Sequence, residues 1–71
     1  MNTERIVTDP NILAGKPTIK GTRVPVDLIL KKLAQNISLD EILQDFPRLT
    51  REDVQAAILY AENLVEEQIP Q

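Results

Sequence analysis

Two side chains suited to reading base edges, Arg51 and Gln55, stand four residues apart at the start of a predicted helix. This spacing places both side chains on one face of the helix. Arginine pairs with guanine, and glutamine with adenine, through two hydrogen bonds each. Lys20, Arg23 and Arg48 add cations of the kind that neutralise nucleic-acid phosphates. These five residues form the candidate DNA-binding set.

Other chemistries are excluded by residue type and spacing. The chain has no Cys and no His, which excludes thiolate zinc sites, Cys nucleophiles and His acid–base catalysis. The segment Gly15-Lys16-Pro17-Thr18 fails as a phosphate-binding loop, because a hydroxyl residue must directly follow the lysine. Adjacent carboxylates such as Asp40-Glu41 point in different directions on a helix. We therefore expect a protein that is not an enzyme, with no cofactor, no metal and no small-molecule substrate.

Three helices are predicted over residues 26–35, 39–46 and 51–68, because apolar residues recur there at helical spacing. Ser38 and Thr50 precede the second and third helices, and each is followed three residues later by an acid, Glu41 or Asp53. This is the capping-box pattern, in which each partner satisfies a backbone N–H of the other. Two abutting helices joined by a tight turn favour a helix-turn-helix.

The first 25 residues are rich in turn signals and short β-prone segments. Gly21 can adopt a positive φ at a tight turn, so a small hairpin is predicted over Thr18–Val24. Such short strands are stable only against the helices. The predicted fold is mainly α: a three-helix helix-turn-helix domain with a short N-terminal β-ribbon. The whole chain, 1–71, is predicted to be one domain, with the β-ribbon over 1–25 and the helical core over 26–69.

Charge is unevenly distributed along the chain. Residues 1–35 hold six basic and three acidic side chains, whereas residues 36–71 hold two basic and eight acidic ones, for a net charge of −3. A sequence pI near 4.7 opposes DNA binding, while the asymmetry favours two surfaces with different partners. Arg23 also has a structural alternative, bracing the hairpin to a helix carboxylate, Asp45 or Glu41.

Four apolar side chains lie at the edge of the helical stripes or outside them: Leu28, Leu59, Tyr60 and Leu64. Together they predict a dimer or partner-docking surface. The alternative is the ordinary exposure of apolar residues in a small domain. No apolar run approaches the roughly 20 residues that span a bilayer, and the N-terminus does not resemble a signal peptide. We therefore expect a cytoplasmic protein without membrane contact.

Several segments resemble one protein family over about residues 4 to 62. They are Arg5–Pro10, Gly15–Val26, Ile42–Thr50 and Ala56–Ala61, and the spacing of Gly-Lys-Pro and Gly-Thr-Arg within them is specific. The family is known only as domain of unknown function 433. The resemblance implies a homeodomain-like fold.

For many members it also implies an antitoxin of a type II toxin–antitoxin pair, partnered with a nuclease-like toxin of the PIN kind. The function predicted for this chain is a homodimeric antitoxin that binds operator DNA. The alternative is a protein-interaction module with no DNA role.

Overall fold

The computed structural model describes residues 3–68, whose helices and strands follow the predicted order. The elements are strands β1 (Ile6–Val7) and β2 (Thr18–Ile19) and helices α1 (Val26–Ala34), α2 (Leu39–Asp45) and α3 (Arg51–Gln68). The three predicted helices are confirmed to within one residue at each end. The predicted limit of the helical core at residue 69 lies outside the described residues. None of these three helices is long and apolar enough to cross a membrane.

The two strands form an antiparallel ribbon in which Ile6 faces Ile19 and Val7 faces Thr18. The predicted turn at Gly21 is confirmed, with φ at +80°. The chain folds back there as expected, but only a single bridge joins Thr18 to Pro25, and the strand partner of β2 is β1. Two backbone hydrogen bonds flank this bridge, from the Ile19 N–H to the Val24 carbonyl at 3.0 Å and from the Val26 N–H to the Pro17 carbonyl at 2.9 Å, and the pairing ends where α1 begins at Val26.

The core forms where β2 and the three helices meet. Its buried apolar residues come from every one of these elements and from the turn before α3: Ile19, Val26, Ile29, Ile42, Leu49, Val54, Ala56 and Ala57. Phe46 is partly buried and packs against this cluster. The Lys32 ammonium lies 5.8 Å from the centre of its ring, within the range of a cation–π contact.

Both predicted capping boxes are present. The Glu41 N–H donates to Ser38 Oγ at 3.2 Å, and the Ser38 N–H donates back to Glu41 Oε1 at 3.1 Å. The Asp53 N–H donates to Thr50 Oγ1 at 3.2 Å, and the Thr50 N–H donates to Asp53 Oδ2 at 3.0 Å. The starts of α2 and α3 are therefore set by local sequence, which defines both ends of the turn between them.

Removing either cap hydroxyl is expected to destabilise the domain. Ser38→Ala and Thr50→Ala should each lower the free energy of unfolding by about 1 kcal/mol, because one backbone N–H at each helix start loses its acceptor. Urea denaturation followed by circular dichroism measures the change. Thr8→Ala is a control, since Thr8 is exposed and precedes no helix. Midpoints equal to the parent for both cap variants would contradict the role assigned to the caps.

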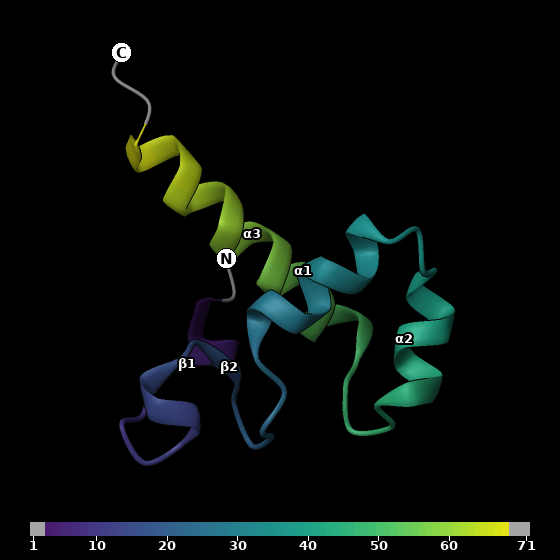
Figure 1. The fold of residues 1–71 in the computed structure, drawn as a ribbon, viewed down its shortest axis with the longest axis horizontal. Coiled ribbons are helices and arrows are strands. Elements are labelled where there is room, and N and C mark those ends of the chain that lie inside the picture. The colour runs from purple at the N-terminus through teal and green to yellow at the C-terminus, as the bar shows by residue number, and fades with distance from the viewer. Residues whose placement is uncertain (1–2, 69–71) are drawn as a thin grey trace.

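The arrangement of the helices leaves part of α3 without cover. Figure 1 shows α1 crossing the N-terminal half of α3, with α2 beyond α1 and the β-ribbon at the other side. The C-terminal half of α3 projects away from the rest of the domain. Exposed apolar side chains concentrate on this helix, including Ile58, Leu64 and Val65.

Candidate nucleic-acid interface

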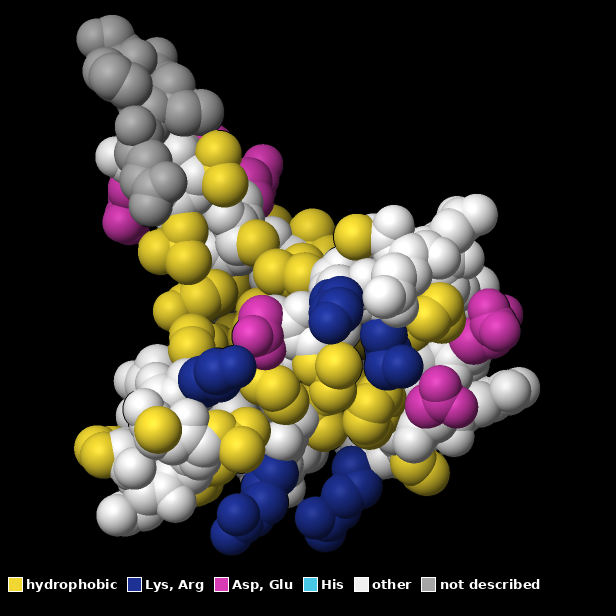
Figure 2. Space-filling view, in the orientation of Figure 1, with side chains coloured by type: hydrophobic (Ala, Val, Ile, Leu, Met, Phe, Trp, Pro, Cys, Tyr) yellow, Lys and Arg dark blue, Asp and Glu magenta, His cyan; other side chains and the backbone are white. Residues whose placement is uncertain are grey.

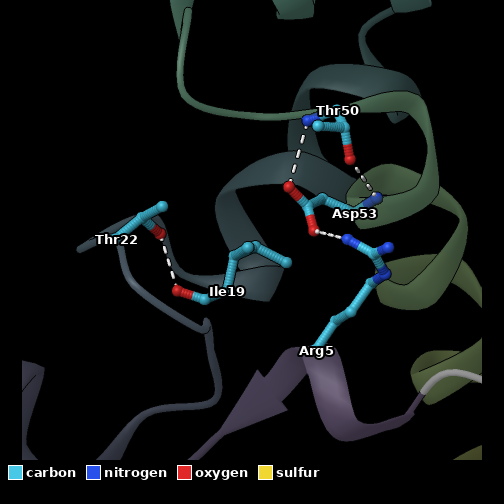
Figure 3. Close-up of polar contacts among 5 residues, drawn as sticks. All are labelled: Arg5, Ile19, Thr22, Thr50 and Asp53. Carbon is cyan, nitrogen blue, oxygen red and sulfur yellow. Dashed lines mark hydrogen bonds and ion pairs between the residues drawn. The ribbon is translucent and has the colours of Figure 1, made fainter.

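The start of α3 is tied to the N-terminal segment through one buried carboxylate. Asp53 is 7% exposed, and its Oδ1 accepts a hydrogen bond from Arg5 Nη1 at 2.9 Å while its Oδ2 accepts from the Thr50 N–H (Figure 3). The guanidinium balances the charge of the carboxylate. One of the two acids at the start of α3 is therefore neutralised within the fold.

This ion pair is the main feature that the sequence alone did not predict. Arg5 and Asp53 are 48 residues apart, and no local spacing relates them. The capping pattern identified Asp53 as the partner of Thr50 and left one carboxylate oxygen without an assigned donor. In the sequence, this unassigned oxygen is the only sign that Asp53 has a second hydrogen-bond donor. The long-range partner could be found only once the fold placed the first residues beside α3.

The turn between β2 and α1 is held in one shape by Thr22. Its Oγ1 donates to the Ile19 carbonyl at 2.7 Å (Figure 3) and accepts from the Val24 N–H at 3.1 Å. The Lys20 N–H donates to the Arg5 carbonyl at 2.7 Å, which anchors the same turn to the N-terminal segment. Lys20 and Arg23 lie on this turn, called the braced turn below, and their side chains are exposed.

Two arginines distant in sequence lie at one hollow in the surface. Arg23, from the braced turn, and Arg48, from the turn between α2 and α3, line this hollow together with Thr22. The same three residues also line a second hollow, on the side of β1. Asp45 lies at one side of the first hollow. Among the described residues Arg23 forms no ion pair with Asp45 or Glu41, so the predicted brace is wrong. Both arginines keep exposed side chains.

The first turn of α3 carries the two predicted base-reading residues. Arg51 Nη2 lies 3.2 Å from Asp40 Oδ1, with the two side chains 63% and 77% exposed. An ion pair this exposed contributes little, so exchanging Asp40 for another anion costs little. Gln55 is exposed and lies one turn further on the same face. Glu52, also exposed, leaves one negative charge nearby.

The five residues of the candidate DNA-binding set therefore lie on connected parts of the fold. Lys20 and Arg23 share the braced turn, Arg48 lines the same hollow as Arg23, and Arg51 begins the helix that follows Arg48. Figure 2 shows basic side chains projecting at the lower edge of one face, whereas acidic side chains lie over α2 and along the far end of α3. The uneven charge of the sequence is thus also uneven in space.

The predicted apolar cluster is only half assembled. Tyr60 and Leu64 line one groove with residues of α1, but Leu28 and Leu59 are half-buried and do not line it. Each of these two residues lies one or two positions from a groove residue, and one step along a helix turns a side chain by about 100°. The groove is lined from α1 by Leu30 instead, a partly buried residue that also packs against the core.

A β-ribbon packed on three helices, with two capped helices joined by a short turn, defines a helix-turn-helix domain of the homeodomain-like kind. Residues 6–61 match the family described as "Protein of unknown function (DUF433)", and the chain belongs to this family. The resemblance identified in the sequence is therefore confirmed.

One solved relative shares the fold, and two curated relatives match in sequence over different shares of their length. The crystal structure of a DUF433 member from Anabaena variabilis superposes with a TM-score of 0.81 at 33% identity, over 89% of this chain and 62% of that one. The uncharacterized protein y4eO of Sinorhizobium fredii is 37% identical over 59 residues, which are 83% of this chain and 27% of y4eO. An uncharacterized protein of Archaeoglobus fulgidus is 62% identical over 24 residues, 34% of this chain and 67% of the relative. The chain thus spans about a quarter of y4eO.

Proposed function

We propose that this chain is a DNA-binding helix-turn-helix protein that regulates its own operator as the antitoxin of a type II toxin–antitoxin pair. The observation that carries the DNA-binding part is the meeting of Arg23 and Arg48 at one hollow beside the start of α3. Phosphate contacts from such flanking segments position a recognition helix on the duplex.

The acidic composition is less of an obstacle than the pI suggests. Arg5 neutralises Asp53, the buried acid nearest to the proposed interface, and the weak pair with Asp40 can be exchanged for a phosphate. The acids at the far end of α3, Glu62, Glu66 and Glu67, belong to the part of the helix that projects from the domain. Glu52 and Asp45 remain as local repulsion, so the expected affinity is moderate and strongly dependent on salt.

The five residues divide into two roles. Lys20, Arg23 and Arg48 come from turns and supply charge, so they contact phosphates and add affinity for any sequence. Arg51 and Gln55 lie on the first turns of α3, the position from which a recognition helix reaches base edges in the major groove. They provide discrimination between sequences.

The antitoxin part of the proposal rests on the family resemblance. A nuclease-like toxin of the PIN kind is the proposed protein partner, and the exposed acids of α3 suit a basic surface on it. The proposed protein is cytoplasmic, acts as a homodimer and is not an enzyme. The second candidate function, a protein-interaction module without a DNA role, is favoured by the apolar groove between α1 and α3.

Mobility shifts on the region upstream of the chain's own gene, and on a scrambled duplex of equal length, test DNA binding. Arg23→Ala and Arg48→Ala should weaken binding to both duplexes and reduce the slope of log affinity against log salt by about 0.9 for each phosphate no longer neutralised. Arg51→Ala and Gln55→Ala should mainly reduce the preference for the upstream duplex, by about 1–3 kcal/mol for each bidentate base pairing that the variant cannot form.

A matched control separates local contacts from net charge. Gln35→Glu lowers the net charge by one, as an Arg→Ala change does, but lies at the end of α1 on neither turn of the interface. It should leave the salt slope unchanged. If the parent protein shifts neither duplex at low salt, with or without the toxin, the interaction-module function replaces this proposal. Equal effects of all the variants would argue against the assigned roles.

A further inference from the structure

The apolar stripe of α3 continues beyond the elements on which it packs. Val54 and Ala57 are 2% and 0% exposed in the core, whereas Leu64, on the same helical face two turns later, is 44% exposed. Val65 and Ile58 extend this apolar surface along the side of the stripe and are 54% and 45% exposed. The apolar face of this amphipathic helix is longer than the surface on which it packs. Its exposed part is therefore expected to bind another protein surface.

A groove lies directly beside this overhang. Its apolar lining comes from the start of α1 and the middle of α3: Val26, Leu30, Tyr60, Ala61 and Leu64, with Pro17 at one end. Figure 2 shows hydrophobic side chains lining the concave region between α3 and the N-terminal segment that carries the β-ribbon. The charges at its rim, Lys16 and Asp27, pair with each other at 3.2 Å. Since this pair leaves the rim without net charge, the groove suits an apolar occupant.

We infer that a second copy of this chain occupies the groove through its own α3. The same helix carries both the groove wall, Tyr60 and Ala61, and the side chains that would fill it, Leu64 and Val65. A surface that holds both complementary parts can close on itself about a two-fold axis, so that each contact occurs twice. With the axis near Ala61, the small side chain lets the two α3 helices approach closely.

The two-fold axis near Ala61 makes the two α3 helices antiparallel, and the charges of α3 favour this arrangement. The last turn of α3 carries Glu66 and Glu67 and no basic residue. Antiparallel helices place these acidic ends at opposite ends of the contact, away from each other. Each end is then carried toward the half of the other copy that holds six basic and three acidic side chains, residues 1–35.

This inference rests on the homodimer of the proposed function and adds the surface that forms it. Its test uses no DNA, so dimerisation and DNA binding can fail separately. The parent chain should sediment as a dimer at micromolar concentration. Leu64→Glu should raise the dimer dissociation constant by roughly a hundredfold or more, because the two-fold axis removes the apolar contact twice. Leu13→Glu is the matched control, since Leu13 is a similarly exposed leucine, at 40%, outside the groove.

Cross-linking locates the axis. The chain has no cysteine, so Ala61→Cys introduces a single thiol beside the proposed axis. Mild oxidation should yield a disulfide-linked dimer much faster than it does for Leu13→Cys, because disulfides form between Cα atoms about 4.4–6.8 Å apart.

A parent that stays monomeric at every concentration would overturn the inference. A dimer unaffected by Leu64→Glu and not cross-linked at position 61 would overturn it as well. In the first case the groove is left to a different partner, and a shift in sedimentation with the candidate toxin alone would identify that partner.

Discussion

Replacing Ile42 by alanine is expected to lower the free energy of unfolding by about 3 kcal/mol. Ile42 is 0% exposed and is the buried residue of α2. This helix has seven residues, too few to be stable without tertiary packing. The total stability expected for a chain of 71 residues is about 4–10 kcal/mol, so one such loss is a large fraction of it.

The same substitution at an exposed position controls for this effect. Ile58→Ala removes the same atoms from a side chain that is 45% exposed on α3, and it should cost less than about 1 kcal/mol. Urea denaturation of both variants, performed below the concentration at which the parent dimerises, measures the two values. Similar losses for both variants would mean that α2 is not held by its buried side chain.

Helix positions were predictable because their signals are local. The apolar spacing and the two capping boxes lie within a few residues of the structures they set, so Ser38 and Thr50 identify the starts of α2 and α3. The turn at Gly21 was predictable for the same reason, since a positive φ there favours glycine. The strand partner of β2 was not, because pairing depends on which distant segment the fold brings alongside.

The candidate interface was predictable only as a set of residue types. Sequence identifies Arg23 and Arg48 as cations, but only the packing of two turns places them at one hollow. Similarly, the ion-pair partner of Asp27 is Lys16, eleven residues away, although Lys31 lies only one helical turn from Asp27. Ion pairs and grooves join residues distant in sequence, and their partners therefore follow from tertiary structure rather than from spacing.

Asp53→Ala is expected to lower the free energy of unfolding by about 3 kcal/mol. The variant loses the acceptor for the Thr50 N–H and leaves the guanidinium of Arg5 without its carboxylate. Arg5→Ala should cost less, about 1.5 kcal/mol, because Asp53 keeps its hydrogen bonds with Thr50 at the helix start. Arg51→Ala, which breaks the exposed pair with Asp40, should cost less than about 1 kcal/mol.

A double-mutant cycle on Arg5 and Asp53 isolates the energy of their contact. If the pair acts as a unit, Arg5→Ala in the Asp53→Ala background should cost nearly nothing, and the coupling energy should lie between about 1 and 2 kcal/mol. Additive losses would show that the two residues stabilise the domain independently. The pair would then contribute no specific link between the N-terminal segment and the helix-turn-helix. The basic turn at Lys20 and Arg23 would be anchored by its backbone hydrogen bonds alone, because the Lys20 N–H donates to the Arg5 carbonyl whatever side chain residue 5 carries.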